Sequence, residues 1–204
     1  VYLVTLIFLE VVMPGLVDPL LSRLENYRLN GLDTGPGSIV PDYSGYSLAN
    51  LPSSICRWLG VTDPGIGPLA GQYHAGLRPR YRQVVLVLVD GLGFSALQAY
   101  RSIEPWVSLL HQSPLLPLGS ICPSTTVSAL TTLWTGLPPS QHGIMGYEMW
   151  LKEYSLTANM ILHAPVAFGA QPGSLRGAGF NPETFLTVQT LGHPMKHHGV
   201  GVFA

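Results

Sequence analysis

Two groups of residues in this chain have the types and spacing needed for chemistry on a charged ligand. The first centres on Asp90, a carboxylate that directly follows the apolar run 84–89 and precedes Gly91. An unbroken run of β-branched and leucine residues predicts a strand buried on both faces, of the kind found in parallel sheets. Ligands and metal ions collect where such strands end. Asp90 is therefore predicted at the carboxyl end of a core strand, in a position suited to binding a metal ion.

The second group is the hydroxyl-rich turn 120–126, with the sequence Ser-Ile-Cys-Pro-Ser-Thr-Thr. The small and apolar residues after it predict a helix that ends at Gly136. Hydroxyl groups at the start of a helix face unpaired backbone N–H groups and the positive end of the helix dipole. That environment suits a phosphate group or a nucleophilic alkoxide.

Each of these residues also has an ordinary structural role. Thr126 can be the N-cap of the helix, a role that Thr125 and Ser124 can fill equally well. Asp90 followed by Gly91 is a common pair in turns. The order of the two motifs favours a chemical role for Asp90 and Thr126 over the structural ones, because the segment that carries the carboxylate comes shortly before the helix that carries the hydroxyls.

Together the motifs resemble the type I phosphodiesterase and nucleotide pyrophosphatase family of the alkaline phosphatase superfamily. In that family an apolar strand ends in a metal-binding Asp, and a Pro-x-x-Thr turn then supplies the nucleophile. Here these elements correspond to Asp90 and to the turn 123–126. The family's helix end and the loop after it correspond to Thr135-Gly136 and His142-Gly143-Ile144. The resemblance covers residues 84–147 and continues more weakly to residue 204.

The resemblance implies a role for each matching position. Thr126 is the implied catalytic nucleophile, and Asp90 and Thr126 are implied metal ligands at a site for two divalent ions, expected to be zinc. The backbone of Val127 and the phenol of Tyr147 are the implied substrate-binding groups. Tyr147 stands where many nucleotide pyrophosphatases have Asn, but a phenol can also donate a hydrogen bond to an anion. His142 is assigned to the architecture of its loop.

The resemblance further implies a truncated alkaline-phosphatase-like fold, an α/β/α sandwich with a mostly parallel central sheet. The alternation of predicted strands and helices agrees with an α/β class. Residues 1–30 form an uncertain N-terminal segment, and 31–83 form an irregular lead-in, rich in Gly and Pro, with short helices. Residues 84–204 are expected to be the N-terminal part of the catalytic domain. The family's other metal ligands lie in its second half, so this chain alone is expected to be inactive.

Composition limits the classes of partner. The chain is 47% hydrophobic and 10% charged with a net charge of −1, which predicts a folded protein and no binding of nucleic acid polymers. The apolar run 1–12 is shorter than the roughly 20 residues of a bilayer span, so stable membrane insertion is not expected. Cys56 and Cys122 lack metal-type spacing and are read as free thiols, which favours a cytoplasmic location over the extracytoplasmic alternative.

These observations predict an enzyme, a metal-dependent phosphoric ester hydrolase of the phosphodiesterase or pyrophosphatase type that acts on a small-molecule phosphate ester. A sulfatase is disfavoured because Cys122 lacks the Arg that follows the sulfatase nucleophile. A dinucleotide-binding domain is a minor alternative, since Ala96 stands where the third glycine of Gly-x-Gly-x-x-Gly belongs. The rival from another class is a non-catalytic α/β module or a pseudoenzyme that binds a phosphorylated ligand.

The remaining pattern predicts the elements that must position these residues. Amphipathic spacing predicts helices near the N-terminus, before Gly60 and after Gly93, and the composition of 42–47 favours a surface loop. The His-rich segment 193–198 is interpreted as a solvated loop. The predicted elements are helices 14–25, 53–59, 95–110 and 126–135, and strands 157–163 and 199–204.

Overall fold

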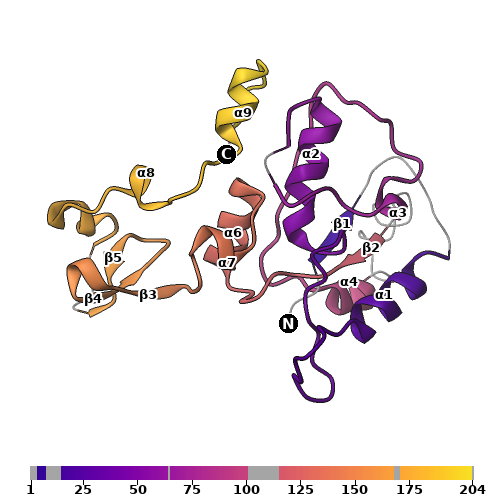
Figure 1. Ribbon diagram of the computed structural model, residues 1–204, viewed down its shortest axis with the longest axis horizontal. Coiled ribbons are helices and arrows are strands. Elements are labelled where there is room, and N and C mark those ends of the chain that lie inside the picture. The colour runs from indigo at the N-terminus through magenta and orange to yellow at the C-terminus, as the bar shows by residue number, and fades with distance from the viewer. Residues whose placement is uncertain (1–3, 8–14, 64, 101–114, 168–170, 204) are drawn as a thin grey trace.

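The structure is a computed structural model that describes residues 4–7, 15–63, 65–100, 115–167 and 171–203. It combines short helices with two small antiparallel sheets (Figure 1). The strands are β1 Val4–Ile7, β2 Leu115–Leu118, β3 Glu148–Leu151, β4 Leu156–Asn159 and β5 Ala164–Pro165. The helices are α1 Val17–Asn26, α2 Leu51–Leu59, α3 Gly71–His74, α4 Phe94–Tyr100, α6 Thr126–Thr135, α7 Pro139–His142, α8 Pro182–Phe185 and α9 Gly192–His197. Short 3-10 helices are η1 Leu48–Asn50, η2 Lys152–Tyr154 and η4 Ser174–Ala178.

The sheet topology confirms a mixed α/β class. β1 pairs with β2, with Val4 opposite Leu118, and β3, β4 and β5 form a three-stranded meander. Ser47 and Gly119 form an isolated parallel bridge. Within the described ranges the sheets are antiparallel, so the mostly parallel central sheet implied by the resemblance is not seen there. No helix in the described part of the chain has the length and apolar character needed to cross a bilayer.

The apolar run 84–89 differs most from its prediction. It forms no strand, and most of its side chains are exposed, with Val85 at 76% and Val87 at 77% of full exposure. The prediction of a buried strand at this position is therefore wrong for this structure. High β-propensity produces a strand only where neighbouring strands supply hydrogen bonds and other layers cover both faces. In the described structure no neighbouring strand pairs with this run, and no other layers cover both of its faces.

The main core lies where α1 and α2 pack near β2 (Figure 1). The predicted helix before Gly60 is confirmed as α2, and it ends at Gly60 because that residue adopts the left-handed φ of 77° that glycine tolerates. The predicted N-terminal helix is confirmed as α1. The buried side chains of this core come from distant parts of the sequence: Leu20, Leu48, Ala49, Leu51, Trp58, Leu69, Tyr73, Leu116, Leu118 and Ile121.

The segment 42–47, predicted as a surface loop, is buried or half-buried instead, except at the exposed Ser44. Asp42 is only 1% exposed, and its carboxylate accepts hydrogen bonds from the Arg23 guanidinium at 2.8 Å and from the backbone N–H of Ser44 at 3.0 Å. Burial by itself would raise the pKa of Asp42, but the hydrogen bonds from Ser44 and Arg23 hold the pKa below its ordinary value. The Asp42 carboxylate is therefore buried and hydrogen-bonded, in a segment that the composition predicted to be exposed to solvent.

The C-terminal third differs in two further respects. The His-rich segment, predicted as a loop, forms helix α9, and Leu191 and Met195 pack with Cys56 and Val61 in a small core of their own. Residues 199–203 form no strand. The predicted strand 157–163 is present only in its first part, as β4, and the predicted helix 95–110 is seen as α4 up to Tyr100, with its remainder outside the described residues.

The exposure of 84–89 leads to a test by mutation. Val87→Ala is expected to lower the free energy of unfolding by less than about 0.5 kcal/mol, because the side chain is already in water. The matched control, Leu118→Ala in β2, is expected to cost about 2–5 kcal/mol because that side chain is fully buried. Urea unfolding measures both. A loss above about 1.5 kcal/mol in Val87→Ala would show that the run is buried after all.

The buried carboxylate gives a second prediction. Asp42→Asn is expected to lower the free energy of unfolding at pH 7 by about 1–3 kcal/mol, because charge-assisted hydrogen bonds are lost at a buried site. Since the folded pKa is depressed, this stabilisation is present above the ordinary carboxyl pKa and disappears as the pH falls through the folded value. Urea unfolding at pH 7 and at acidic pH measures the difference. Glu25→Gln, at an exposed position on α1, is the control and should change little.

Candidate active site

The turn that leads to the hydroxyl-rich helix is fastened to the buried segment 43–48. Gly119 approaches that segment so closely that an added Cβ would lie 3.0 Å from the carbonyl oxygen of Tyr46, so a side chain here would crowd the backbone. The contacts are hydrogen bonds between the two segments: Leu48 N to Gly119 O at 2.7 Å, Gly119 N to Tyr46 O at 2.9 Å, Ser47 Oγ to Ser120 O at 2.8 Å, and Cys122 N to Tyr43 Oη at 3.1 Å. The sequence interpretation missed these supports, although Ser47-x-x-Asn50 is a recognisable capping box.

Helix α6 begins one residue after its cap. Thr125 is the N-cap, and its hydroxyl accepts a hydrogen bond from Ser128 N at 3.4 Å and pairs with Ser128 Oγ at 2.8 Å. The helix ends at Gly136, as predicted, with a φ of 71°. Because Thr125 occupies the capping position, the hydroxyl of Thr126 is not needed for capping. The N-cap role that the sequence left open for Thr126 is therefore taken by Thr125.

Asp90 and Thr126 meet although they are 36 residues apart in sequence. The Thr126 hydroxyl donates a hydrogen bond to Asp90 Oδ2 at 3.2 Å. Asp90 lies in the turn after 84–89, next to Gly91 with its φ of 73°, and Thr126 is the first residue of α6. Asp90 is exposed and Thr126 half-buried, so the pair faces solvent. A carboxylate and a helix-initial hydroxyl therefore share one accessible space.

The pair has the spacing of two ligands of one metal ion. Two oxygen atoms bound to a tetrahedral zinc at about 2.0–2.2 Å lie roughly 3.3–3.6 Å from each other. The observed 3.2 Å between Thr126 Oγ1 and Asp90 Oδ2 is close to that value. The described residues contain no group of three or more His, Cys, Asp or Glu side chains able to hold a metal. The two oxygens are compatible with two ligands of one ion, and the same 3.2 Å is the length of the hydrogen bond between them.

The two residues expected to bind substrate lie in different environments. The Val127 side chain is buried with Ile144 and Leu151, so only its backbone N–H, in the open first turn of α6, is suited to an anion. Tyr147 precedes β3 and is 42% exposed, and its carbonyl oxygen accepts a hydrogen bond from Met160 N. No hydrogen bond within the described structure joins the Tyr147 phenol to Asp90 or Thr126. Both substrate-binding roles remain predictions.

His142 is placed as a structural residue. Its Nδ1 accepts a hydrogen bond from Ile144 N at 3.1 Å, so its proton is on Nε2, which lies 3.0 Å from Thr132 Oγ1. The side chain is 2% exposed, and burial lowers the pKa of the imidazole. A neutral His142 therefore ties the loop after α7 to the middle of α6, in agreement with the role in loop architecture expected for it.

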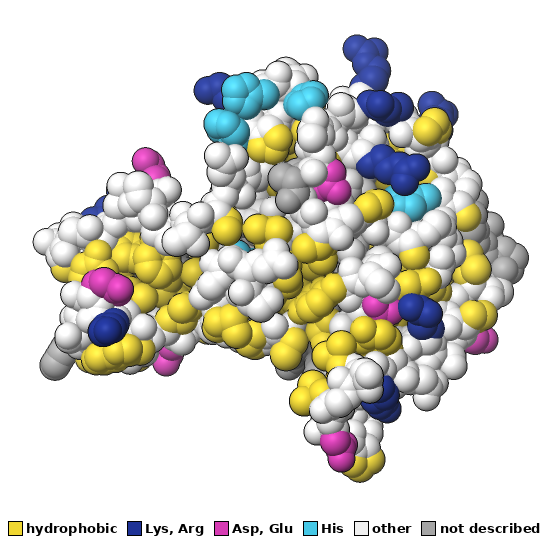
Figure 2. Space-filling view, in the orientation of Figure 1, with side chains coloured by type: hydrophobic (Ala, Val, Ile, Leu, Met, Phe, Trp, Pro, Cys, Tyr) yellow, Lys and Arg dark blue, Asp and Glu magenta, His cyan; other side chains and the backbone are white. Residues whose placement is uncertain are grey.

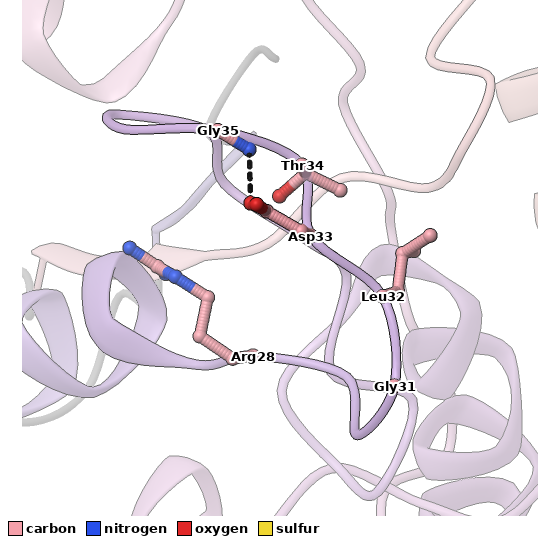
Figure 3. Close-up of a pocket in the computed structure, with 6 residues that line it drawn as sticks. All are labelled: Arg28, Gly31, Leu32, Asp33, Thr34 and Gly35. Carbon is pink, nitrogen blue, oxygen red and sulfur yellow. Dashed lines mark hydrogen bonds between the residues drawn. The ribbon is translucent and has the colours of Figure 1, made fainter.

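A cavity of about 440 Å³ lies in the loop after α1 and does not include this site. It is formed within one short stretch of chain, where Asp33 Oδ1 accepts a hydrogen bond from Gly35 N at 2.9 Å (Figure 3). Arg28 and Leu32 line it, and neither Asp90 nor Thr126 does. The candidate site is therefore an open surface site and not this cavity.

The site places an accessible hydroxyl at the start of a helix beside a carboxylate. Residues 84–179 match the model of the family described as Type I phosphodiesterase / nucleotide pyrophosphatase. The resemblance predicted from the motifs is confirmed for this part of the chain. No curated protein and no solved structure gives a significant match.

The placement of His142 predicts a pH dependence of stability. Its folded pKa is below the ordinary value of about 6.5, so acidification below that value protonates the unfolded chain first and lowers the free energy of unfolding. His142→Gln should have a lower free energy of unfolding than the parent at pH 7.5, and this energy should fall less between pH 7.5 and 5.5. Part of the fall should remain in the variant, because burial also lowers the pKa values of His74 and His163. Urea unfolding at the two pH values measures it. An equal change in the free energy of unfolding with pH in parent and variant would contradict a neutral His142. The control is His198→Gln, at an exposed position.

Proposed function

We propose that this chain carries the nucleophile and part of the metal site of a metal-dependent phosphoric ester hydrolase of the phosphodiesterase or pyrophosphatase type. The observation that carries the proposal is the 3.2 Å hydrogen bond between Thr126 Oγ1 and Asp90 Oδ2, because both residues lie within the matched segment 84–179. Chance proximity of these two residue types is a weaker explanation, because the resemblance drawn from the motifs implies roles for the same two positions.

Asp90 and Thr126 would hold one of two divalent ions, with zinc the expected metal. A divalent ion bound there lowers the pKa of a coordinated hydroxyl and stabilises negative charge on the phosphoryl oxygens. Ligands for the second ion are not found among the described residues. We therefore propose that residues 1–204 on their own have little or no turnover.

Thr126 is the proposed nucleophile. Its Oγ1 gives up its proton to solvent and forms a bond to phosphorus, while the bond from phosphorus to the leaving oxygen breaks and the leaving group departs into solvent, which gives a phosphothreonine. Water then attacks the phosphorus of this ester, which releases the phosphate product and returns a proton to Oγ1, so the hydroxyl is restored. Asp90 Oδ2 orients the hydroxyl by accepting its proton in a hydrogen bond. The first-turn N–H groups of α6, including that of Val127, are suited to bind the charge that develops on the phosphoryl oxygens.

The proposal extends to the wider setting of the chain. A small-molecule phosphate ester is the proposed substrate, with Tyr147 as a donor at its edge, and the proposed complete fold is the alkaline-phosphatase-like sandwich with a parallel sheet. The free thiols of Cys56 and Cys122 favour a reducing compartment such as the cytoplasm. The net charge of −1 supports a small substrate over a nucleic acid polymer.

A second candidate is a module that binds a phosphorylated ligand without turnover. The same shortage of metal ligands in the described residues favours it. The two candidates differ in one property, because only the hydrolase needs the Thr126 hydroxyl to form and release a covalent ester, whereas a binding module needs only donors and charge.

The nucleophile assignment is tested by hydrolysis of bis(4-nitrophenyl) phosphate with added Zn²⁺, by this chain and by any longer form that carries further metal ligands. Thr126→Ala is expected to lower the turnover that is present by about a thousandfold or more, because no other group replaces the nucleophile. Ser124→Ala, which removes a neighbouring hydroxyl, should change it less than about threefold. Retained turnover in Thr126→Ala would overturn the assignment. Phosphate binding with no turnover in any form would favour the binding module.

A further inference from the structure

Helix α9 carries two histidines whose ring nitrogens face each other. His193 and His197 are four residues apart, so they lie on the same side of the helix. Their Nε2 atoms are 3.2 Å apart, and the ring centroids are separated by 4.6 Å. Both side chains are exposed, and histidine side chains gather at the same edge of the molecule as α9 (Figures 1 and 2).

The backbone under this pair is held by packing. Leu191 and Met195, next to the histidines on the opposite side of the turn, are buried against Cys56 and Val61 at the end of α2. The start of α9 is fixed to α6 because Leu191 N donates to Trp134 O at 2.7 Å. Because the helix is anchored on two neighbours, the two imidazoles are kept near each other before any ligand arrives.

The spacing matches a metal chelate. Two imidazole nitrogens bound to a tetrahedral ion at about 2.0–2.1 Å lie roughly 3.3 Å apart, and the observed separation is 3.2 Å. Without a metal, one Nε2–H can donate to the other Nε2, so the pair is also stable when empty. We propose that His193 and His197 chelate a divalent transition-metal ion through their Nε2 atoms, at a site separate from Asp90 and Thr126.

The chemistry of the site limits the ligand. Two neutral imidazoles suit Cu²⁺, Ni²⁺ or Zn²⁺ and not Mg²⁺ or Ca²⁺, which prefer oxygen ligands. His198 does not join the pair, since its Nδ1 bonds Pro194 O at 2.9 Å and its Nε2 lies 3.4 Å from Thr62 Oγ1. The described residues offer no third protein ligand, so water completes the coordination. Lys196 is close in sequence, but its charge is exposed and screened by salt.

The site lies outside the matched segment 84–179, so it does not depend on the proposed hydrolase. Calorimetric titration of the chain with Cu²⁺ and then with Zn²⁺, in an Asp90→Asn background that removes the other candidate ligand pair, measures it alone. We expect one ion per chain, with Cu²⁺ bound more tightly than Zn²⁺. His193→Ala and His197→Ala should each weaken Cu²⁺ binding about tenfold or more, because a single imidazole remains.

His198→Ala is the matched control, because it removes an exposed imidazole from the end of the same helix and should change the affinity less than about twofold. Ring proton signals of His193 and His197 should be the ones broadened by substoichiometric Cu²⁺ in an NMR spectrum. Unchanged affinity in either His193→Ala or His197→Ala, or an equal loss in His198→Ala, would overturn the proposal. Far-UV circular dichroism of each variant confirms that the fold is intact.

Discussion

The arrangement of the candidate site depends on the hydrogen bonds that fasten the turn 119–122 to the buried segment 43–48. Four main-chain or side-chain bonds join the two segments, and Gly119 approaches Tyr46 so closely that a side chain here would crowd the backbone. These bonds are largely buried, and breaking one would leave a polar group unpaired inside the protein. The start of α6, only a few residues further on, therefore has a defined position relative to the main core.

At the start of α6, two adjacent threonines make different contacts. Thr125 satisfies the open end of the helix, and Thr126 is left with a hydroxyl directed at Asp90. Two threonines in a row thus differ in their contacts, since the first caps the helix and the second bonds a carboxylate from a distant part of the chain. Further along the helix, His142 joins Thr132 to the loop at Ile144, so both the start and the middle of α6 are held by buried or half-buried hydrogen bonds.

Asp90 has weaker support than Thr126. It follows a run whose apolar side chains are exposed and whose backbone belongs to neither sheet, so the hydrogen bond from Thr126 is the contact that relates it to α6. A run of five exposed Val and Leu side chains is unusual on the surface of a folded protein. The part of the site that belongs to a helix is thus built on a packed core, whereas the turn with Asp90 is tied in by the hydrogen bond from Thr126 and by the partial packing of Val84 and Leu92 on either side of it.

The sequence alone determined the local features, because capping residues, glycines and helical spacing act over a few residues. Helices α1 and α2 and the end of α6 at Gly136 were accessible in this way, and the motifs that carry the resemblance lie in the segment that the family model matches. Tertiary structure decided the rest. Whether 84–89 pairs as a strand, whether Asp42 is buried beside Arg23, and whether His193 and His197 share a helix face depend on what packs against them. Those partners lie far away in the sequence, where local patterns carry no information about contact.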